Sequence, residues 1–286
     1  MLEAARGRLG LRVCRASYIG SRAEQQDAAE VTDEIEAAFL AVLADGMGGM
    51  LMGRECAVRA VDAFGEAFAA RSSGEIADAL MSAARRTNEV VLDWAAERGA
   101  AEETGCTLVC AAVARDRLYW LSVGDSHIYL FREGKLTRLN EEHNLRTRLA
   151  RSGAQSAEAE RYTGANLAAL TSFIGIRELA EIDFPDEPLP LAAGDAVLLC
   201  SDGLYGSLSG GETAEILSSG ADDPAAALIE AVAAKGFERQ DNATAVVIEA
   251  GGVEKSAGAC AAKRAAADGG APSILTAAAR FLRFVR

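Results

Sequence analysis

Two short segments of this chain are apolar at almost every position, and they constrain its fold more than any other feature. Residues 39–44 read FLAVLA and residues 196–200 read AVLLC. Short apolar runs bounded by turn residues are typical of strands buried on both faces. The first run leads directly into the pair Asp45-Gly46, and the second leads through Ser201 into Asp202-Gly203. We therefore expect buried strands that end in acidic turns.

Further strands and helices are expected around these two segments. The other expected strands are residues 118–123, their antiparallel neighbours 108–114 and 128–131, and a last strand at 244–249. Residues 115–117 and 124–126 are expected to be the tight connections within this group. Apolar positions at three-to-four spacing predict helices at 53–70, 75–98, 210–219 and 224–236. Strand hairpins with helices gathered in blocks indicate an α+β layered fold instead of alternating β-α-β units.

The charge of the chain limits its partners. Its 286 residues hold 29 Lys and Arg against 42 Asp and Glu, a formal net charge of −13. A surface this acidic repels a phosphate backbone, which argues against nucleic-acid binding. The negative potential of such a surface also repels any phosphorylated substrate, unless bound cations make the potential positive locally.

Cysteine usage excludes two kinds of site and indicates a compartment. None of the six cysteines forms a C-x-x-C pair, and only two histidines are present, which excludes a zinc-finger site. No cysteine is followed six positions later by arginine, which argues against a cysteine-based phosphatase loop. Buried free thiols favour a soluble cytoplasmic protein, and neither a signal peptide nor a run of ~18 apolar residues is apparent.

The composition changes near residue 250. Half of the chain (50%) is hydrophobic, which fits one large domain at residues 1–250. Residues 251–272 are rich in Ala and Gly and read as a linker. Residues 273–286, SILTAAARFLRFVR, form a basic amphipathic tail. The tail is expected either to be a frayed helix or to dock on a membrane or a partner protein, and it is the only expected membrane contact.

Five aspartates occupy similar settings. Asp45, Asp125 and Asp202 follow apolar strands, Asp27 ends a polar run, and Asp241 precedes the last strand. Asp-Gly is a common turn dipeptide and Asp often caps helices, so a turn or a cap explains any one of these aspartates taken alone. Turns do not need repeated carboxylates at the ends of buried strands, whereas Mg²⁺ and Mn²⁺ need oxygen ligands. The set therefore predicts a divalent-cation site.

Such a site predicts phosphate chemistry. Two cations about 3.5–4 Å apart can share a water, lower its pKa and hold a phosphate for in-line attack. Gly46, next to Asp45, lets the backbone approach closely enough for a carbonyl oxygen to join the ligands. A dinucleotide site is excluded because position 51 is Leu, so no G-x-G-x-x-G is completed, and no Gly-Lys-Ser/Thr marks a P-loop.

Six motifs in chain order carry a family resemblance. They are Ser21-Arg22-x-x-x-Gln26-Asp27, Ala44-Asp45-Gly46-Met47-Gly48-Gly49, Gly105-Cys106-Thr107, Val123-Gly124-Asp125-Ser126, Cys200-Ser201-Asp202-Gly203-Leu204 and Asp241-Asn242-x-Thr244. This series resembles that of the PPM (type 2C) metal-dependent Ser/Thr protein phosphatases, especially the bacterial branch. The resemblance covers residues 12–249 and implies a four-layer α-β-β-α sandwich of two antiparallel sheets flanked by helices.

The resemblance also implies roles for individual residues. The metal ligands would be Asp27, Asp45, Gly46, Asp125, Asp202 and Asp241. Asp45 would bridge two Mn²⁺ or Mg²⁺ ions, with the Gly46 carbonyl in one shell. Asp202 and Asp241 would hold the first ion. Asp27 would support either the second shell or the second ion, and Asp125 matches a weaker third site. Arg22 would bind the substrate phosphate, since its planar fork meets two phosphate oxygens.

Three positions depart from the family pattern. Gln25 stands where Asn is usual, Met50 replaces a common His, and His127 replaces the usual Arg after Gly-Asp-Ser. None of them removes a metal carboxylate, so the departures bear on substrate preference and turn stability. Met47 follows the bacterial form and cannot act as a general acid, which leaves protonation of the leaving group to a metal-bound water.

The resemblance implies hydrolysis of phosphoserine and phosphothreonine. A metal-bridging hydroxide would attack phosphorus directly, without a covalent phosphoenzyme, while Arg22 and the metals neutralise the developing charge. Expected partners are phosphorylated Ser/Thr proteins and a cognate Ser/Thr kinase with its targets. The alternative is a catalytically inactive regulatory binding module of the same fold. His127 and His143 are expected to be hydrogen-bonded structural residues, and residues 144–168 are expected to be a flap that selects substrates.

Overall fold

Strand β3 (Ala38–Asp45) is buried on both faces, as its sequence predicts. Leu40, Val42 and Ala44 pack toward helices, while Phe39 and Leu43 face a second sheet, because successive side chains of a strand point in opposite directions. β3 thus lies between a layer of helices and a second sheet.

The structure is a computed structural model that describes residues 9–35, 38–47, 52–70, 75–101, 103–152 and 164–251.

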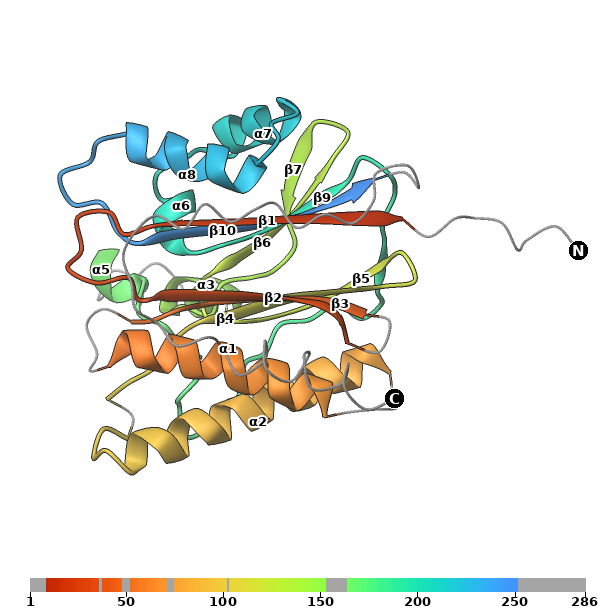
Figure 1. Ribbon diagram of the computed structural model, residues 1–286. Coiled ribbons are helices and arrows are strands. Elements are labelled where there is room, and N and C mark those ends of the chain that lie inside the picture. Colours follow the sequence, from red (N-terminus) through yellow and green to blue (C-terminus); the bar gives the residue numbers. More distant parts are fainter. Residues whose placement is uncertain are drawn as a thin grey trace, which may run out of the picture.

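Two five-stranded antiparallel sheets form the two inner layers (Figure 1). One sheet has the order β1 (Gly10–Tyr18), β10 (Ala243–Gly251), β9 (Ala196–Cys200), β6 (His127–Arg132) and β7 (Lys135–Arg138). The other has the order β2 (Asp27–Ile35), β3, β4 (Leu108–Ala114), β5 (Arg117–Val123) and β8 (Leu189–Pro190).

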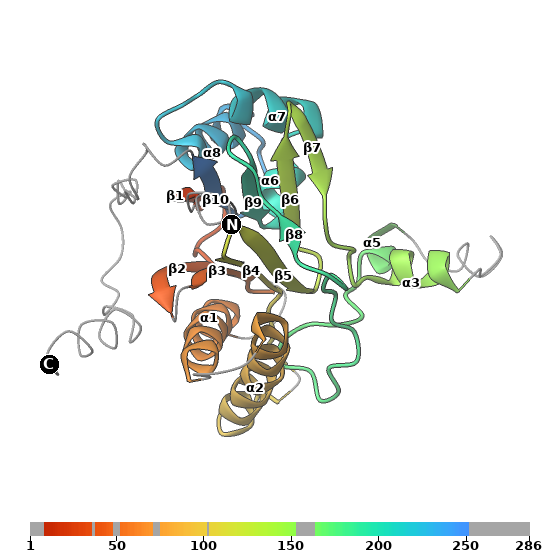
Figure 2. The ribbon, with the colours of Figure 1, turned by 90° about the vertical axis from the view of Figure 1, so that its right-hand side faces the viewer.

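Helices cover the outer face of each sheet. Figure 2 shows α1 (Gly53–Ala69) and α2 (Ile76–Ala96) against the β2–β8 sheet, and α7 (Gly210–Ser218) and α8 (Pro224–Ala234) against the other. Three apolar clusters fill the spaces between the four layers. The predicted α-β-β-α sandwich is therefore confirmed. Short helices α6 (Asp202–Tyr205), α3 (Leu145–Arg151) and α5 (Gly164–Leu167) lie near one end of the sheets.

One predicted strand pairing is wrong. β6, which contains residues 128–131, pairs with β9 and β7 in the other sheet and not with β5. Residues 124–126 therefore form a crossing between the sheets, made possible at Gly124 by a φ of +100°. Ile128 then packs against Leu118 in the core between the sheets. By contrast, the tight β4–β5 connection is confirmed.

Four strands, β1, β2, β7 and β8, were not predicted from the sequence. β1 and β2 carry charged residues among their apolar ones, so neither gives a continuous apolar run. Both lie at sheet edges, where a strand needs less apolar surface. They matter for the site because β2 begins at Asp27.

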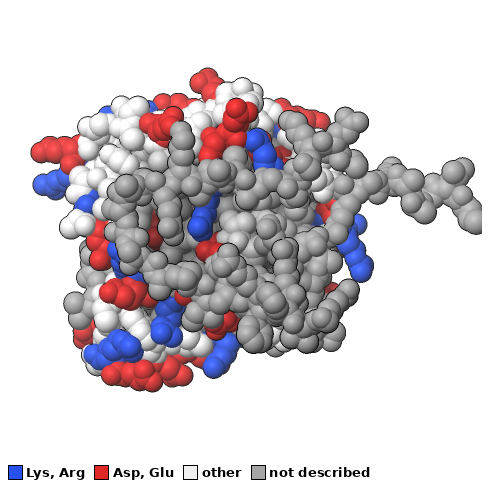
Figure 3. Space-filling model, in the orientation of Figure 1, with Lys and Arg blue, Asp and Glu red and all other residues white. Residues whose placement is uncertain are grey.

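The described fold ends with β10 at Gly251, so the predicted linker and tail lie outside the described residues, as do the central residues 153–163 of the predicted flap. In the part of the chain that the structure describes, no helix is long and apolar enough to cross a membrane. Acidic and basic side chains are interspersed over the described part of the face in Figure 3.

Candidate metal centre

The register of β2 and β3 places two of the predicted aspartates side by side. Asp27, the first residue of β2, pairs directly with Asp45, the last residue of β3. Ser201, which precedes α6, donates its hydroxyl hydrogen to Asp27 Oδ2 at 2.7 Å. Ser201 comes from the end of β9 in the opposite sheet, so Asp27 joins the two sheets at the end where their strands meet.

Gly46 occupies a space that admits no side chain. A Cβ at this position would lie 2.3 Å from the Gly53 carbonyl oxygen and 2.8 Å from that of Gln26. Its neighbour Asp45 is fixed through Thr107, whose Oγ1 accepts a hydrogen bond from the Asp45 amide at 3.0 Å. Glycine at this position therefore lets three backbone segments pack closely beside Asp45, and the role of the Gly46 carbonyl as a ligand stays a prediction.

Asp202 and Asp241 come from the other sheet. Asp202 opens α6 one residue after β9 ends, and Asp241 lies shortly before β10. Gly203 packs so closely on this segment that a Cβ would lie 2.0 Å from the Asn242 carbonyl oxygen. Asn242 in turn accepts a hydrogen bond from the Gln26 amide at 2.8 Å, which ties the Asp241 segment to the Asp27 segment.

Burial and mutual repulsion raise the pKa of most of these carboxyl groups. Burial, followed by the charges of Asp27, Asp202, Asp125 and Asp241, raises the pKa of Asp45 well above its usual range. Burial is also the largest cause for Asp27, whose pKa rises to about 6, and for Asp125, whose pKa rises to about 7. All four other aspartates thus act electrostatically on Asp45.

The donor set fits a hard divalent cation. Asp27 Oδ1 is buried and has no hydrogen-bond partner among the described residues, although a carboxylate oxygen without one is costly to bury. Among the described residues, no group of three or more Asp, Glu, His or Cys side chains is arranged so that it could hold a metal ion by itself. Hard cations complete their shells with backbone carbonyls and water, and a cation offsets the repulsion that raises these pKa values.

Arg22 lies at the rim of this cluster. Its Nη2 donates to Asp241 Oδ2 at 2.6 Å, and both side chains are partly exposed. Arg22 can therefore be reached from solvent next to the predicted metal ligands. The structure thus brings all six predicted ligands and Arg22 to one end of the sandwich.

Several residues that support the aspartates were not predicted as such. Ser201 and Thr107 hold Asp27 and Asp45, and Tyr205 donates to the Asp125 carbonyl oxygen at 3.1 Å. Ser201 and Thr107 lie inside the six motifs, which is the signal that marks them. Tyr205 has no such signal, because it lies 80 positions from its partner.

The departures from the family pattern have different structural outcomes. Gln25 Oε1 accepts a hydrogen bond from the Asp27 amide at 3.0 Å, so it stabilises the turn before β2. His127 and His143 are buried and hydrogen-bonded, His143 by accepting from the Gly124 amide at 3.1 Å. Met50 lies outside the described residues.

Two stacked antiparallel sheets with carboxylates gathered at one end match the arrangement that the resemblance to the PPM phosphatases implies. A family model described as Protein phosphatase 2C matches residues 16–233. The chain therefore belongs to the protein phosphatase 2C family.

Named relatives and solved structures agree with this family. A serine/threonine phosphatase stp of Listeria monocytogenes is 32% identical over 215 residues, which cover 73% of this chain and 84% of that protein. The S. agalactiae serine/threonine phosphatase superposes with a TM-score of 0.73 at 26% identity and covers 84% of this chain and 99% of its own. The catalytic domain of the phosphatase PstP, solved with two manganese ions, has a TM-score of 0.67 at 27% identity, covering 85% of this chain and 100% of its own.

Proposed function

We propose that this chain hydrolyses phosphoserine and phosphothreonine in proteins, with two divalent cations held by Asp27, Asp45, Gly46, Asp202 and Asp241, and a weaker site at Asp125. The observation that carries the proposal is the set of buried aspartates around Asp45, one of which leaves a buried oxygen without a partner. Buried carboxylates that repel one another are costly unless cations accompany them.

The cations, Asp45 and Arg22 have separate roles in the proposed reaction. Bound Mn²⁺ or Mg²⁺ supplies an activated water and positive charge at the phosphate. Asp45, paired with Asp27 and held through Thr107, has a fixed place on the β2–β3 side of the site. Arg22, at the exposed rim, orients the phosphate through two of its oxygens and neutralises the charge that builds on them. No side chain forms a covalent bond to phosphorus.

The proposed physiological setting follows the sequence. Substrates are phosphorylated Ser/Thr proteins, among them a cognate Ser/Thr kinase and its targets. A cytoplasmic location is supported by five buried cysteines with free thiols, Cys14, Cys56, Cys106, Cys110 and Cys200. Residues 1–250 are proposed as the catalytic domain, with the amphipathic tail as an appended segment.

The test is hydrolysis of a phosphothreonine peptide by the full chain. We expect turnover with Mn²⁺, none with excess chelator, and a loss of at least about a hundredfold in kcat for Asp45→Asn. Folded protein that shows no turnover with Mn²⁺ or Mg²⁺ would favour the inactive binding module instead. A phosphoenzyme trapped on Cys or Asp would refute direct attack by water.

A further inference from the structure

The turn that carries Asp125 is held from three directions. Gly124 and His143 exchange two hydrogen bonds, from the Gly124 amide to His143 Nδ1 at 3.1 Å and from the His143 amide to the Gly124 carbonyl oxygen at 2.9 Å. On the other side, Ser126 Oγ lies 2.7 Å from Thr107 Oγ1. The third contact is the Tyr205 hydroxyl, which donates to the Asp125 carbonyl oxygen at 3.1 Å.

The third contact links two of the proposed metal ligands. Helix α6 is only four residues long, with Asp202 at its start and Tyr205 at its end. The same short helix therefore carries the Asp202 carboxylate and the hydroxyl group that holds the backbone of Asp125. The Tyr205 hydroxyl therefore ties the Asp125 turn to the helix that begins with Asp202.

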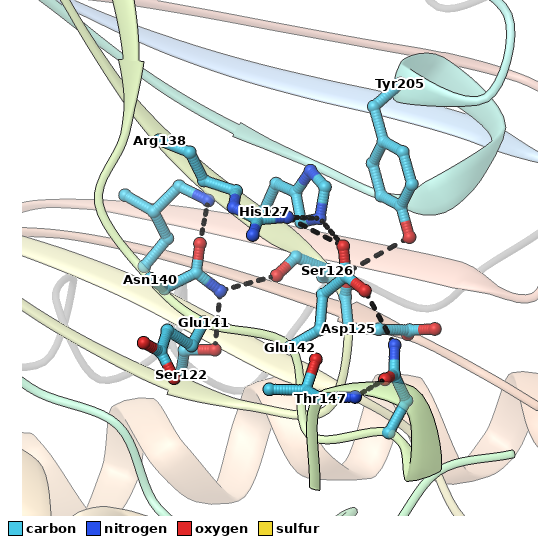
Figure 4. A network of polar contacts seen from close by, with 12 residues as sticks. Ser122, Asp125, Ser126, His127, Arg138, Asn140, Glu141, Glu142, Thr147 and Tyr205 are labelled. Carbon is cyan, nitrogen blue, oxygen red and sulfur yellow. Dashed lines mark hydrogen bonds and ion pairs between the residues drawn. The ribbon is translucent and has the colours of Figure 1, made fainter. Parts of the chain in front are cut away.

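His127 fixes the Tyr205 ring. The two rings stack with their centroids 3.7 Å apart and their planes at 14°. His127 is buried at the start of β6, with Nδ1 2.8 Å from the Tyr129 hydroxyl and Nε2 2.9 Å from Glu142 Oε1. Both ring nitrogens thus have partners, so the ring is held in one orientation. Figure 4 shows the contact between His127 and Glu142.

Glu142 anchors this ring to the next part of the chain. Besides His127 it contacts Arg138 Nη1 at 2.7 Å and Asn144 Nδ2 at 2.6 Å. Contact with His127 comes first among the causes that lower the pKa of Glu142 to about 2, so its carboxylate stays charged. Asn144 also caps α3 by accepting from the Thr147 amide at 2.9 Å. Glu142 thereby connects His127 to the first turn of α3.

We propose that His127 is a positioning residue: through its stack on Tyr205 and its hydrogen bond to Glu142 it holds the Asp125 turn in place relative to Asp202. This inference rests on the proposed function, because it takes Asp125 and Asp202 as ligands of a divalent cation. His127 itself touches neither substrate nor cation. Its contribution would be to the cation affinity of the weaker site at Asp125, through the position of the Asp125 turn relative to Asp202.

The predicted effect is weaker cation binding with unchanged binding of the peptide substrate. Loss of a group that orients a metal ligand lowers metal affinity by about 10–100-fold. Tyr205 holds a backbone oxygen and not the carboxylate itself, so we expect about three- to tenfold. Arginine both stacks on aromatic rings and pairs with carboxylates, so it should replace His127 where alanine does not.

The experiment uses the full chain and four variants: Tyr205→Phe, His127→Ala, His127→Arg and Tyr119→Phe. Tyr205→Phe deletes only the hydroxyl group and retains the ring that stacks on His127. Tyr119→Phe, on β5 but outside this network, is the matched control. The primary readout is Mn²⁺ binding without substrate, measured from the electron paramagnetic resonance signal of free Mn²⁺. The second readout is KM and kcat for a phosphothreonine peptide at saturating Mn²⁺.

We expect Tyr205→Phe and His127→Ala to weaken the binding of the most weakly held Mn²⁺ about three- to tenfold, with KM within twofold of wild type. His127→Arg and Tyr119→Phe should bind Mn²⁺ as the wild type does. Unchanged Mn²⁺ binding in Tyr205→Phe overturns the inference, even if His127→Ala fails to fold. So does a loss in His127→Arg equal to that in His127→Ala. A wild type without metal-dependent turnover would instead refute the proposed function.

Discussion

At the scale of single residues, the site depends on how closely neighbouring backbone segments approach one another. Gly46 and Gly203 both lie where an added Cβ would collide with a backbone carbonyl, and backbone atoms cannot move aside as a flexible side chain can. The glycines beside Asp45 and Asp202 therefore have a packing role in addition to any part in a turn.

Gly203→Ala should be destabilising and should impair the metal site. The new Cβ would lie 2.0 Å from the Asn242 carbonyl oxygen, which forces the Asp241 segment away from Asp202. We expect a loss of about 1–3 kcal/mol in the free energy of unfolding, measured by urea denaturation, together with weaker Mn²⁺ activation. Gly210→Ala, where a Cβ meets nothing within 4 Å, is the matched control. Equal stability of the two variants would contradict this account.

The sequence was most informative about the ligands themselves and least about their supports. Asp45 and Asp202 could be predicted because each follows an apolar strand in the chain. The role of Tyr205 could not, since it is a contact between residues 80 positions apart and leaves no local pattern. The role of Gln25 was also not apparent from the sequence. Although it departs from the family pattern, its side chain donates a hydrogen bond to the Tyr18 carbonyl oxygen and accepts one from the Asp27 amide in the turn before β2.

At the scale of elements, apolar periodicity predicted the strands and helices that are buried on one or both faces. β3, β4 and β9 were located to within a residue because they are buried along almost their full length. The partner of β6 was predicted wrongly. A strand that pairs with the strand before it and a strand that crosses to the facing sheet have the same local pattern of apolar residues. Only Gly124, with its φ of +100°, marks the crossing.

Helix α1 offers a test of the packing between helices and sheet. Val61 is 3% exposed and packs in the cluster beneath β3, whereas Val58 on the same helix is 45% exposed. Val61→Ala removes two buried methyl groups, and we expect it to cost about 2 kcal/mol. Val58→Ala should be neutral or slightly stabilising, because alanine favours helix. Chemical denaturation of both variants measures the change in the free energy of unfolding. A larger loss of stability for Val58→Ala than for Val61→Ala would show that α1 packs through its other face.

At the scale of the whole molecule, two sheets contribute carboxylates to one site, so the site and the stability of the fold are linked. Asp27 and Asp45 come from one sheet, and Asp202 and Asp241 from the other. Repulsion between them opposes closure of the sandwich at this end. Protons or cations should therefore stabilise the folded protein, each in its own pH range.

Without metal, the protein should become less stable as pH rises from 5 to 8. The folded-state pKa values of about 6 for Asp27 and about 7 for Asp125 exceed the unfolded value of about 3.9. Their contribution to stability is thus complete below about pH 4 and is lost as pH rises through 6 and 7. In chelator, Tm should fall over this range. With saturating Mn²⁺ the trend should reverse, because protons compete with the cation. The same trend in both conditions would contradict a metal site at these residues.

The central claim, that the aspartates around Asp45 hold the cations, is tested most directly by counting bound Mn²⁺ in equilibrium titrations of the full chain. The comparison is between wild type, Asp45→Asn and Asp116→Asn, which removes the same charge from the β4–β5 turn, where Asp116 accepts from the Leu9 amide. We predict at least two ions for wild type and Asp116→Asn, and a loss of affinity of at least about tenfold for Asp45→Asn. Equal Mn²⁺ binding by all three proteins would contradict the account.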